Sequence, residues 1–261
     1  MKLNKRLLAL SKMANQPYQV VWDCCCDHGL LGFKILANGL TKQVNFVDVV
    51  PELIESLSQK LTKYAHHLPA GSQWQALCQD VAELKLEPIR KLESYVLQSE
   101  KRSDLNDEYD EMDNRDIPSD KILPANLVII SGVGGELMID IITRLMQRYS
   151  GENIDFLLCP VQHTYKLRLT LIELGFNLKQ EQLIIENNRG YELMLINQLQ
   201  GEPLSVTGNK LWKSEASHEA YLSKLINHYK KMNKSNRREL KLESLALKDY
   251  LSLQNRLYKN I

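Results

Sequence analysis

Short apolar segments alternate with helical patterns along most of this chain, and this alternation constrains the fold more than any other feature. Strands are predicted over residues 19–22, 44–47, 73–77, 127–130 and 156–159. Helices are predicted over 30–38, from Pro51 as a first helical residue, from Glu136 and over 166–174. Strands that alternate with helices of this length form βαβ units, which build a parallel sheet covered on both faces. The sequence therefore predicts an α/β protein with a Rossmann-like sheet.

The last part of the pattern differs from the βαβ units. Two further strands, over 183–185 and 191–196, are joined by Asn187-Asn188-Arg189-Gly190, which predicts an antiparallel hairpin. Beyond residue 205, apolar side chains recur every three or four positions in two stretches, the first containing Leu222, Leu225, Tyr229 and Met232 and the second Leu240, Leu247, Leu251 and Tyr258. A short polar segment separates the stretches, so we predict two helices of about 20 residues in an antiparallel hairpin.

Charge is distributed unevenly, although the net charge is only +1. Residues 104–120 contain eight acidic residues against Arg115 alone, a sum of −7. We predict that an insertion over about residues 88–124 is disordered, because it has little to bury. An acidic segment that binds a partner is the alternative.

The segment from 205 to 261 has the opposite charge, with twelve Lys and Arg against five Asp and Glu, a sum of +7. Several of the cations are concentrated where the two helices meet: Lys230, Lys231, Lys234, Arg237 and Arg238. Such a patch can neutralise phosphates, or it can simply keep the end of a coiled coil solvated. Beside a cofactor-binding domain, RNA is the better interpretation. The predicted organisation is a domain over 1–200 and a basic, coiled-coil-like hairpin over 201–261.

The remaining composition indicates a cytoplasmic protein. Five cysteines, an odd number with three adjacent, suit a reducing compartment better than a disulfide framework. Leu7-Leu8-Ala9-Leu10 is too short for the apolar region of a signal peptide, and nowhere do 18 apolar residues run together. We therefore expect no membrane contact. The sequence does not define an oligomeric state, and a monomer is compatible with it.

The loop after the first strand is expected to bind a cofactor, as the first βα loop of a doubly wound sheet does. It reads Asp23-Cys24-Cys25-Cys26-Asp27-His28-Gly29, which is not the G-x-G-x-x-G of a dinucleotide site. Asp48 ends the second strand, where a carboxylate can accept both ribose hydroxyls, and Asp80 follows the third, where it can receive an adenine amine. Acids at successive strand ends suit a cationic cofactor without phosphate. This pattern favours S-adenosylmethionine (SAM).

The three adjacent cysteines do not indicate a metal site. Neighbouring side chains on a turn point apart, and no C-x-x-C pair accompanies them, so we expect no bound metal. A nucleophilic cysteine is an alternative, but small residues that pack a tight loop are the simpler interpretation. After the fourth strand, Ser131-Gly132-Val133-Gly134-Gly135 lacks bulky side chains where the methyl donor or a flat substrate would pass close to the backbone.

These motifs resemble one family, the bacterial tRNA (adenine(22)-N1)-methyltransferases, which are TrmK-like. The resemblance covers about residues 3–87 and 124–261 and rests on five matches: Lys5-Arg6-Leu7, Asp23 with Asp27-His28, Gly132-Val133-Gly134-Gly135, Pro160 with His163, and Tyr191-Glu192. The basic carboxyl-terminal hairpin matches as well. The resemblance implies a class I methyltransferase sheet, SAM as cofactor and tRNA as partner, with the methyl group moved to adenine N1 at position 22.

The chain also departs from the family pattern. Cys25 stands where the family has the loop glycine, Val161 where it has asparagine and Cys159 where it has glutamine. The acidic insertion is not part of the pattern. If position 25 requires a positive φ angle, Cys25 crowds the methionine tail of SAM. Val161 removes an amide that would hold the target base, so the departures concern the target nucleotide more than the cofactor.

The chemistry assigns roles to the matching residues. Adenine N1 has an in-plane lone pair and attacks without first losing a proton, so the enzyme must align the base, balance the new charge and exclude water. We predict that Asp27 accepts the N6 hydrogen and that His28 positions it or binds substrate. The predicted cofactor-binding residues are Asp23, Cys25, Gly29, Asp48, Asp80, Ser131 and Gly132. The predicted substrate-binding residues are Gly134, Gly135, Pro160, His163, Arg168, Tyr191, Lys5, Arg6, Lys230, Lys231, Arg237 and Arg238.

The target base must leave the tRNA stack to reach the site, and Tyr165 or Tyr191 could then stack on it. His163, Arg168, Lys5 and Arg6 are expected at RNA phosphates.

Three alternatives remain open at this stage. The first is a SAM-dependent methyltransferase with another substrate, such as another nucleoside, rRNA or a small molecule, although the basic hairpin argues against the last. The second is a noncatalytic RNA-binding relative that has lost chemistry through Cys25 and Val161; the retained acids and glycine turn argue against it. The third is a nicotinamide dehydrogenase, which the missing glycine fingerprint disfavours.

Overall fold

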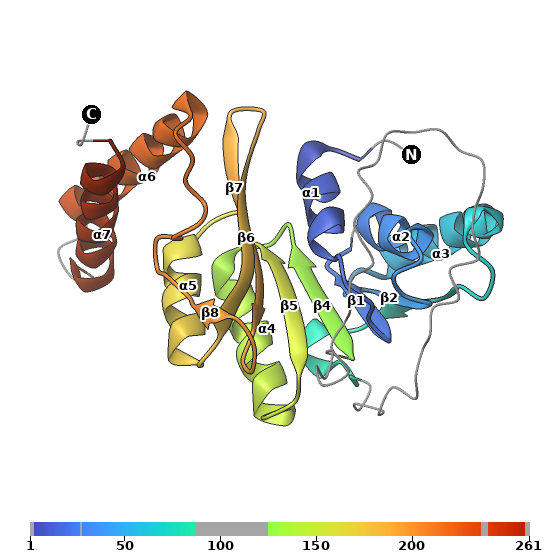
Figure 1. The fold of residues 1–261 in the computed structure, drawn as a ribbon. Helices are drawn as coiled ribbons and strands as arrows, with labels where there is room; N and C mark the ends of the chain where they lie inside the picture. The colour runs from blue at the N-terminus through green and yellow to red at the C-terminus, as the bar shows by residue number, and fades with distance from the viewer. Residues whose placement is uncertain (1–2, 27, 87–124, 236–239, 259–261) are drawn as a thin grey trace, which may run out of the picture.

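The computed structural model describes residues 3–26, 28–86, 125–235 and 240–258, and Figure 1 shows their arrangement. The strands are β1 (Val20–Cys24), β2 (Gln43–Asp48), β3 (Gln73–Cys78), β4 (Asn126–Ser131), β5 (Ile154–Cys159), β6 (Asn177–Glu186), β7 (Arg189–Asn197) and β8 (Glu202–Pro203). The α-helices are α1 (Lys5–Met13), α2 (Leu30–Ala37), α3 (Pro51–Tyr64), α4 (Gly135–Arg148), α5 (Thr164–Glu173), α6 (Ala216–Ser235) and α7 (Leu240–Tyr258). Two short 3₁₀ helices, η1 (Ala65–His67) and η2 (Val81–Glu83), follow α3 and β3.

All eight strands belong to one sheet, in the order β3-β2-β1-β4-β5-β7-β6-β8. The five strands from β1 to β5 pair in parallel, whereas β7 pairs antiparallel with both β5 and β6. The strand order turns outward on either side of β1 and β4, which is the switch point of a doubly wound sheet. The predicted Rossmann-like α/β class is confirmed. The acidic insertion predicted over 88–124 lies outside the described residues.

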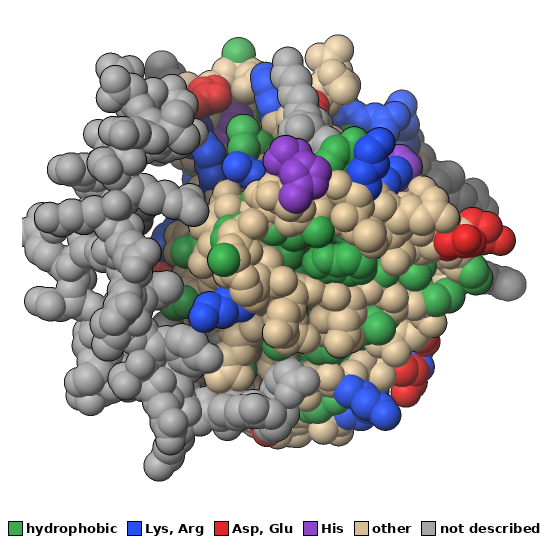
Figure 2. Space-filling model, turned by 90° about the vertical axis from the view of Figure 1, so that its right-hand side faces the viewer, with side chains coloured by type: hydrophobic (Ala, Val, Ile, Leu, Met, Phe, Trp, Pro, Cys, Tyr) green, Lys and Arg blue, Asp and Glu red, His purple; other side chains and the backbone are tan. Residues whose placement is uncertain are grey.

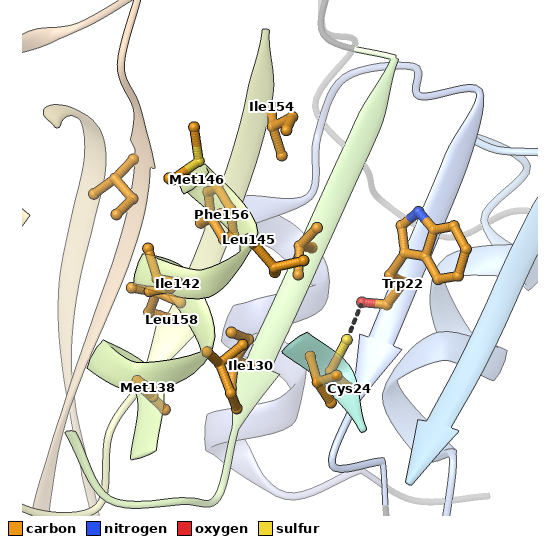
Figure 3. Close-up of a cluster of buried hydrophobic side chains, with 14 of the residues drawn as sticks. Trp22, Cys24, Ile130, Met138, Ile142, Leu145, Met146, Ile154, Phe156 and Leu158 are labelled. Atoms are coloured by element: carbon orange, nitrogen blue, oxygen red, sulfur yellow. Dashed lines mark hydrogen bonds between the residues drawn. The ribbon is translucent and has the colours of Figure 1, made fainter. Parts of the chain in front are cut away.

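Apolar side chains cover both faces of the sheet, as the unbroken apolar strands predict. On one face, α4 packs through Met138, Ile142 and Leu145 onto Ile130 and Leu158, as Figure 3 shows. Trp22 and Cys24 extend this cluster onto β1, where the Cys24 thiol donates to the Trp22 carbonyl at 3.7 Å. The other face carries a second cluster, which includes side chains of α1, α2 and α3. The sheet is thus the middle layer of three.

The turn between β6 and β7 is shorter than the four-residue connection that the sequence suggested. Asn187 and Asn188 form it alone, with φ angles of +50° and +59°. Both angles suit the two-residue turn that follows the right-handed twist of a hairpin, and asparagine tolerates them. Glu186 pairs with Arg189 across the turn. The predicted antiparallel hairpin is confirmed.

The two carboxyl-terminal helices pack against each other and against α5 (Figure 1). Their shared core contains Leu222, Ile226, Ala246, Tyr250 and Leu253, together with Tyr165 of α5. The predicted seam is confirmed at Leu222, which is buried in this core. Five other predicted residues are partly buried and pack against the core, whereas Met232 is exposed; the five are Leu225, Tyr229, Leu247, Leu251 and Tyr258. A seam that also contacts α5 needs a broader apolar face than a two-helix pair.

The face of the molecule at α3 carries exposed cations and histidines, and Figure 2 views the molecule from this side. His66 and His67 follow α3 with ring centroids 4.0 Å apart, and Lys63 lies over the Tyr64 ring at 5.6 Å. A small crevice lined by His28 and Lys60 joins this surface to the loop after β1.

Candidate functional site

The carboxyl ends of the parallel strands bring the predicted site residues to one edge of the sheet. In the pairing register, Cys24 stands between Val47 of β2 and Ile130 of β4. Asp48 pairs with Cys78, and Ser131 pairs with Cys159. The loops that follow β1, β2, β4 and β5 therefore leave the sheet side by side, as ligand-binding loops of this fold class do.

Asp23 organises the first of these loops from inside the protein. Its side chain is buried, and its Oδ2 accepts a hydrogen bond from the Gly32 N–H at 2.8 Å. A Cβ at Gly32 would lie 2.5 Å from Phe46 Cε1 and 2.8 Å from Asp23 Oδ2, so only glycine allows the start of α2 to approach β1 and β2 this closely. Gly29, with φ of +65°, turns the chain into α2. Asp23 and Gly29 thus shape the loop, and their role in cofactor binding stays a prediction.

Burial raises the pKa of the Asp23 carboxyl from 3.8 to about 7. Between about pH 4 and pH 7, the folded protein then holds one proton more than the unfolded chain. The free energy of unfolding should fall as pH rises through this window, by at most about 1.4 kcal/mol per pH unit. Asp23→Asn, which cannot ionise, should lack this contribution. Urea unfolding of both proteins at several pH values measures it, and parallel pH dependences would contradict the raised pKa.

Cys25 occupies a backbone conformation that favours glycine. Its φ angle is +56°, in the left-handed region. Where the resemblance places a glycine, this chain thus has a residue that carries a Cβ. The side chain is partly buried against the core cluster of β1 and β4, which supports the strained position by packing.

The strain at Cys25 gives a stability prediction. Cys25→Val should lower the free energy of unfolding by about 1–2 kcal/mol, because a β-branched side chain suits positive φ poorly. Cys25→Gly relieves the backbone but loses packing, so it should stay within about 1 kcal/mol of the wild type. Cys78→Val, at an exposed position in a strand, is the control that should be tolerated. Equal losses from the two valine variants would contradict backbone strain at Cys25.

The thiols near the site are poor nucleophiles. Burial, together with the nearby carboxylates of Asp48, Asp23 and Asp80, raises the pKa of Cys25 to about 11. Burial likewise raises the pKa of Cys24 and of Cys26 above the usual range. Thiols of this kind stay protonated at neutral pH, which weighs against thiolate catalysis. Among the described residues, no group of three or more His, Cys, Asp or Glu side chains is arranged to hold a metal ion.

Asp48 and Asp80 lie at the next two strand ends, as predicted. Asp48 Oδ1 accepts from the Val50 N–H at 3.1 Å, which fixes the carboxylate at the end of β2. Asp80 Oδ1 accepts from the Ala82 N–H at 2.9 Å, and its Oδ2 accepts from Arg144 at 3.0 Å. The bond from Ala82, followed by those from Arg144, lowers the pKa of Asp80. Negative charge thus surrounds the first loop on the side of β2 and β3.

The glycine loop after β4 and the loop after β5 are joined by backbone hydrogen bonds. Gly132 N–H donates to the Cys159 carbonyl at 3.3 Å, Val161 N–H to the Val133 carbonyl at 3.0 Å, and Gly135 N–H to the Gln162 carbonyl at 2.9 Å. Gly132 has φ of +86°, and a Cβ added there would meet open space, so the loop leaves room beside Ser131. At Gly135 a Cβ would lie 2.7 Å from the His163 carbonyl oxygen, so glycine is required for the close contact. The two loops form one unit.

Arg6 and Tyr191 approach the end of β5 from α1 and β7. The Arg6 guanidinium lies 5.0 Å from the centre of the Tyr191 ring. Burial raises the pKa of the Cys159 thiol to about 12, and a hydrogen bond with Arg6 opposes this increase. Lys5 N–H donates to Glu186 at 2.7 Å, which ties α1 to β6. Arg6, Tyr191 and the buried Pro160 thus lie near the loop unit, whereas the exposed Lys5 side chain lies at its outer edge.

Two residues of α5 do not have the predicted roles. Arg168 is fully buried, where it donates to Glu181 at 2.8 Å and to Glu192 at 3.0 Å, so its expected contact with an RNA phosphate is wrong. Tyr165 is also buried, and its hydroxyl donates to Asp249 of α7 at 2.7 Å, so it cannot stack on a target base. Both side chains instead join α5 to its neighbours.

The other predicted substrate residues fall into two groups. Lys230 and Lys231 are exposed near the end of α6, and His163 is exposed at the start of α5. Arg237, Arg238 and Asp27 lie outside the described residues, so their assignments stay predictions. His28 is exposed directly before Gly29.

Several residues near the site were missed by sequence reasoning. The Gln162 side chain lies against Gly134, within 3.2 Å of the position of a Cβ there. Val49 beside Asp48 is 62% exposed and offers apolar surface, as does Val161, which the sequence had already indicated and which is 49% exposed. Arg144 holds Asp80 from α4. No local motif indicates Gln162 or Arg144, because each contacts a residue that is distant in the sequence.

These features define a class of protein. Among the described residues, no helix has both the length and the apolar character needed to cross a membrane. The sheet order, with acids after β1, β2 and β3 and a glycine loop after β4, is that of a Rossmann-like protein with a cofactor site for a cationic nucleoside. A family model described as "Methyltransferase domain" matches residues 3–84 and 79–194. The chain belongs to this methyltransferase family.

Solved structures show the same fold over nearly the whole chain. The TrmK of M. capricolum, in complex with the cofactor product S-adenosyl-homocysteine, is 18% identical with a TM-score of 0.62, and the match covers 99% of this chain and 96% of that one. The M1A22 tRNA methyltransferase TrmK of B. subtilis is 17% identical with a TM-score of 0.61, covering 99% and 98%. An NADB-Rossmann superfamily protein of Streptococcus agalactiae is 16% identical with a TM-score of 0.63, covering 97% of both chains. A search of curated proteins found no match.

Proposed function

We propose that this protein is a SAM-dependent tRNA methyltransferase that moves a methyl group to adenine N1, at position 22 of tRNA. The observation that carries the proposal is that the carboxylates of Asp48 and Asp80, at the ends of β2 and β3, lie at the same edge of the sheet as the linked glycine and β5 loops. Family membership supports methyl transfer, and the similarity to TrmK structures over 99% of the chain supports the choice of substrate.

The residues at the strand ends fit SAM. When bound, SAM supplies an electrophilic methyl group on a sulfonium centre. Asp48 is assigned to the ribose hydroxyls and Asp80 to the adenine amine, while Ser131 and Gly132 leave open space for the methionine end. The charges of Asp48 and Asp80, which contribute to the raised pKa of Cys25, also attract a sulfonium cation. Cys25 narrows this space compared with glycine.

The target base is assigned to the side of the loop unit. Val161 is exposed and Gly134 is partly exposed, so this part of the loop unit offers an apolar wall where the family has an amide, while Gly135 and Pro160 are buried. Asp27 accepts the adenine N6 hydrogen and balances the positive charge of the product, with His28 next to it. Tyr191, braced by Arg6, provides a ring for the extruded base.

We assign tRNA binding to basic residues near both ends of the chain and to His163. Lys5 and Arg6 lie on α1, His163 at the start of α5, and Lys230 and Lys231 near the end of α6. Arg237 and Arg238, which follow in the sequence, are assigned to the same role. Contacts to phosphate at several points give affinity without base specificity. The division of labour follows: residues 1–200 transfer the methyl group and residues 201–261 hold tRNA. The five free cysteines suit a cytoplasmic protein.

Methyl transfer from labelled SAM to unmodified bulk tRNA, followed by nucleoside mass spectrometry, tests the proposal. The expected product is 1-methyladenosine, and mapping by primer extension should place it at position 22. Another methylated nucleoside would support the alternative of a different RNA target and would make Val161 the residue to examine. SAM binding without any methylated nucleoside would exclude tRNA as the substrate, and the absence of SAM binding would leave a noncatalytic relative.

A further inference from the structure

Glu136 lies in the first turn of α4, directly after the glycine loop. It faces His163 at the end of the loop after β5 and Lys166 in α5. Its Oε1 accepts from Lys166 Nζ at 2.7 Å and lies 3.7 Å from His163 Nδ1. His163 precedes α5 and Lys166 lies in its first turn. Glu136 therefore connects the side chains of the two loops that are already joined through their backbones.

The backbone of His163 has an unusual conformation at the start of α5. Its φ angle of +59° is unusual for a residue with a side chain, and it begins α5 without a side-chain cap. Its carbonyl oxygen packs against Gly135, the residue before Glu136. The backbone of His163 is thus in close contact with Gly135, and its imidazole lies next to the Glu136 carboxylate.

The charge of Glu136 is maintained at neutral pH. The hydrogen bond from Lys166 lowers its pKa, and the charges of Lys166 and His163 lower it further. All three side chains are about half exposed, so the ion pairs add little to stability. Their contribution is to fix the side chains of His163 and Lys166 relative to α4.

We propose that Glu136 is a positioning residue for methyl transfer, which holds His163 and Lys166 in place at the loop unit to which the target base is assigned. This inference rests on the proposed function. His163 is one of several assigned phosphate contacts, so its release should change tRNA binding little, whereas rates respond to displacements of about 1 Å at the reacting atoms.

Glu136→Gln tests the inference, since it removes the charge and keeps the size of the side chain. We expect about a tenfold lower kcat, with KM for tRNA and Kd for SAM within about twofold of the wild type. Glu136→Asp, which keeps the charge, should recover much of the rate. Glu152→Gln, at an exposed position in the turn after α4, is the matched control and should retain wild-type kinetics.

A double-mutant cycle with Lys166→Met tests the pairing itself. If the two residues act together, Glu136→Gln/Lys166→Met should be no slower than the slower single variant. Turnover by Glu136→Gln within twofold of the wild type would overturn the inference, as would losses that multiply in the double variant. A lower kcat that is accounted for by a lower folded fraction, measured by circular dichroism, would overturn it as well.

The wild-type reaction separates this inference from the proposed function. If wild-type protein methylates no adenine in tRNA, the proposed function fails. If the wild type is active and Glu136→Gln equals it, the function stands and the positioning role of Glu136 is rejected.

Discussion

Arg168→Met should lower the free energy of unfolding by about 3–5 kcal/mol, because it leaves buried glutamates without their cation. Glu181 and Glu192 have side-chain exposures of 0% and 1%. The guanidinium also donates to the Ser205 carbonyl at 3.0 Å, and the Tyr221 hydroxyl donates to Glu192 at 3.1 Å. Methionine fills much of the same volume but satisfies none of these acceptors.

Urea unfolding at neutral pH measures this loss, with Lys166→Met on the exposed side of the same helix as the control. Burial raises the pKa of Glu192. Without Arg168, the glutamates should take up protons on folding, so the deficit should shrink as pH falls. A loss below about 1 kcal/mol, or one that grows at acidic pH, would show that the cluster is not held by this cation.

Asp27→Ala should lower methyl transfer by about 10²–10³-fold while SAM still binds. This prediction rests on the sequence, because the chemistry needs a carboxylate that stabilises the cationic product, and groups of this kind contribute about that much to rate. Single-turnover kinetics with labelled SAM gives the rate, and calorimetry gives the SAM affinity.

Two further variants sharpen this test. Asp27→Asn keeps the acceptor oxygen and removes the charge, so it should lie between the alanine variant and the wild type. Glu55→Ala, an exposed acid on α3, is the control. Wild-type turnover by Asp27→Ala would remove Asp27 from the mechanism, and loss of SAM binding would make it a cofactor residue instead.

The sequence predicted the central strands well because their apolar runs are buried on both faces. β4 extends one residue beyond the predicted range at each end, and β5 begins two residues earlier and ends at the predicted residue. β6 begins at Asn177, well before the predicted 183, since alternating half-buried residues near the edge of the sheet carry a weak signal. The two-residue β8 has no signal of its own, because it exists only by pairing with β6.

The site was predictable where function follows strand ends. Asp48, Asp80 and the glycine loop lie where the spacing indicated, and the resemblance pointed to an unusual backbone at Cys25. Arg168 was misread because a window around α5 shows a cation on a helix but not the glutamates 13 and 24 residues later that converge on it. Glu136 and Lys166 are 30 residues apart, so their pairing depends on tertiary structure alone.

The Arg168 cluster has a consequence for how such a protein can be recombined. The chain between the sheet and the hairpin contributes to it directly, through the Ser205 carbonyl and through Lys210 N–H, which donates to Glu181 at 2.7 Å. Tyr221 adds a hydroxyl from α6. A hairpin grafted from a relative at a junction near residue 201 must therefore restore contacts to three residues inside the recipient's sheet and α5. The hairpin and the buried charges next to it therefore form one structural unit, and a chimaera that ignores these charges exchanges its carboxyl-terminal helices at the expense of its core.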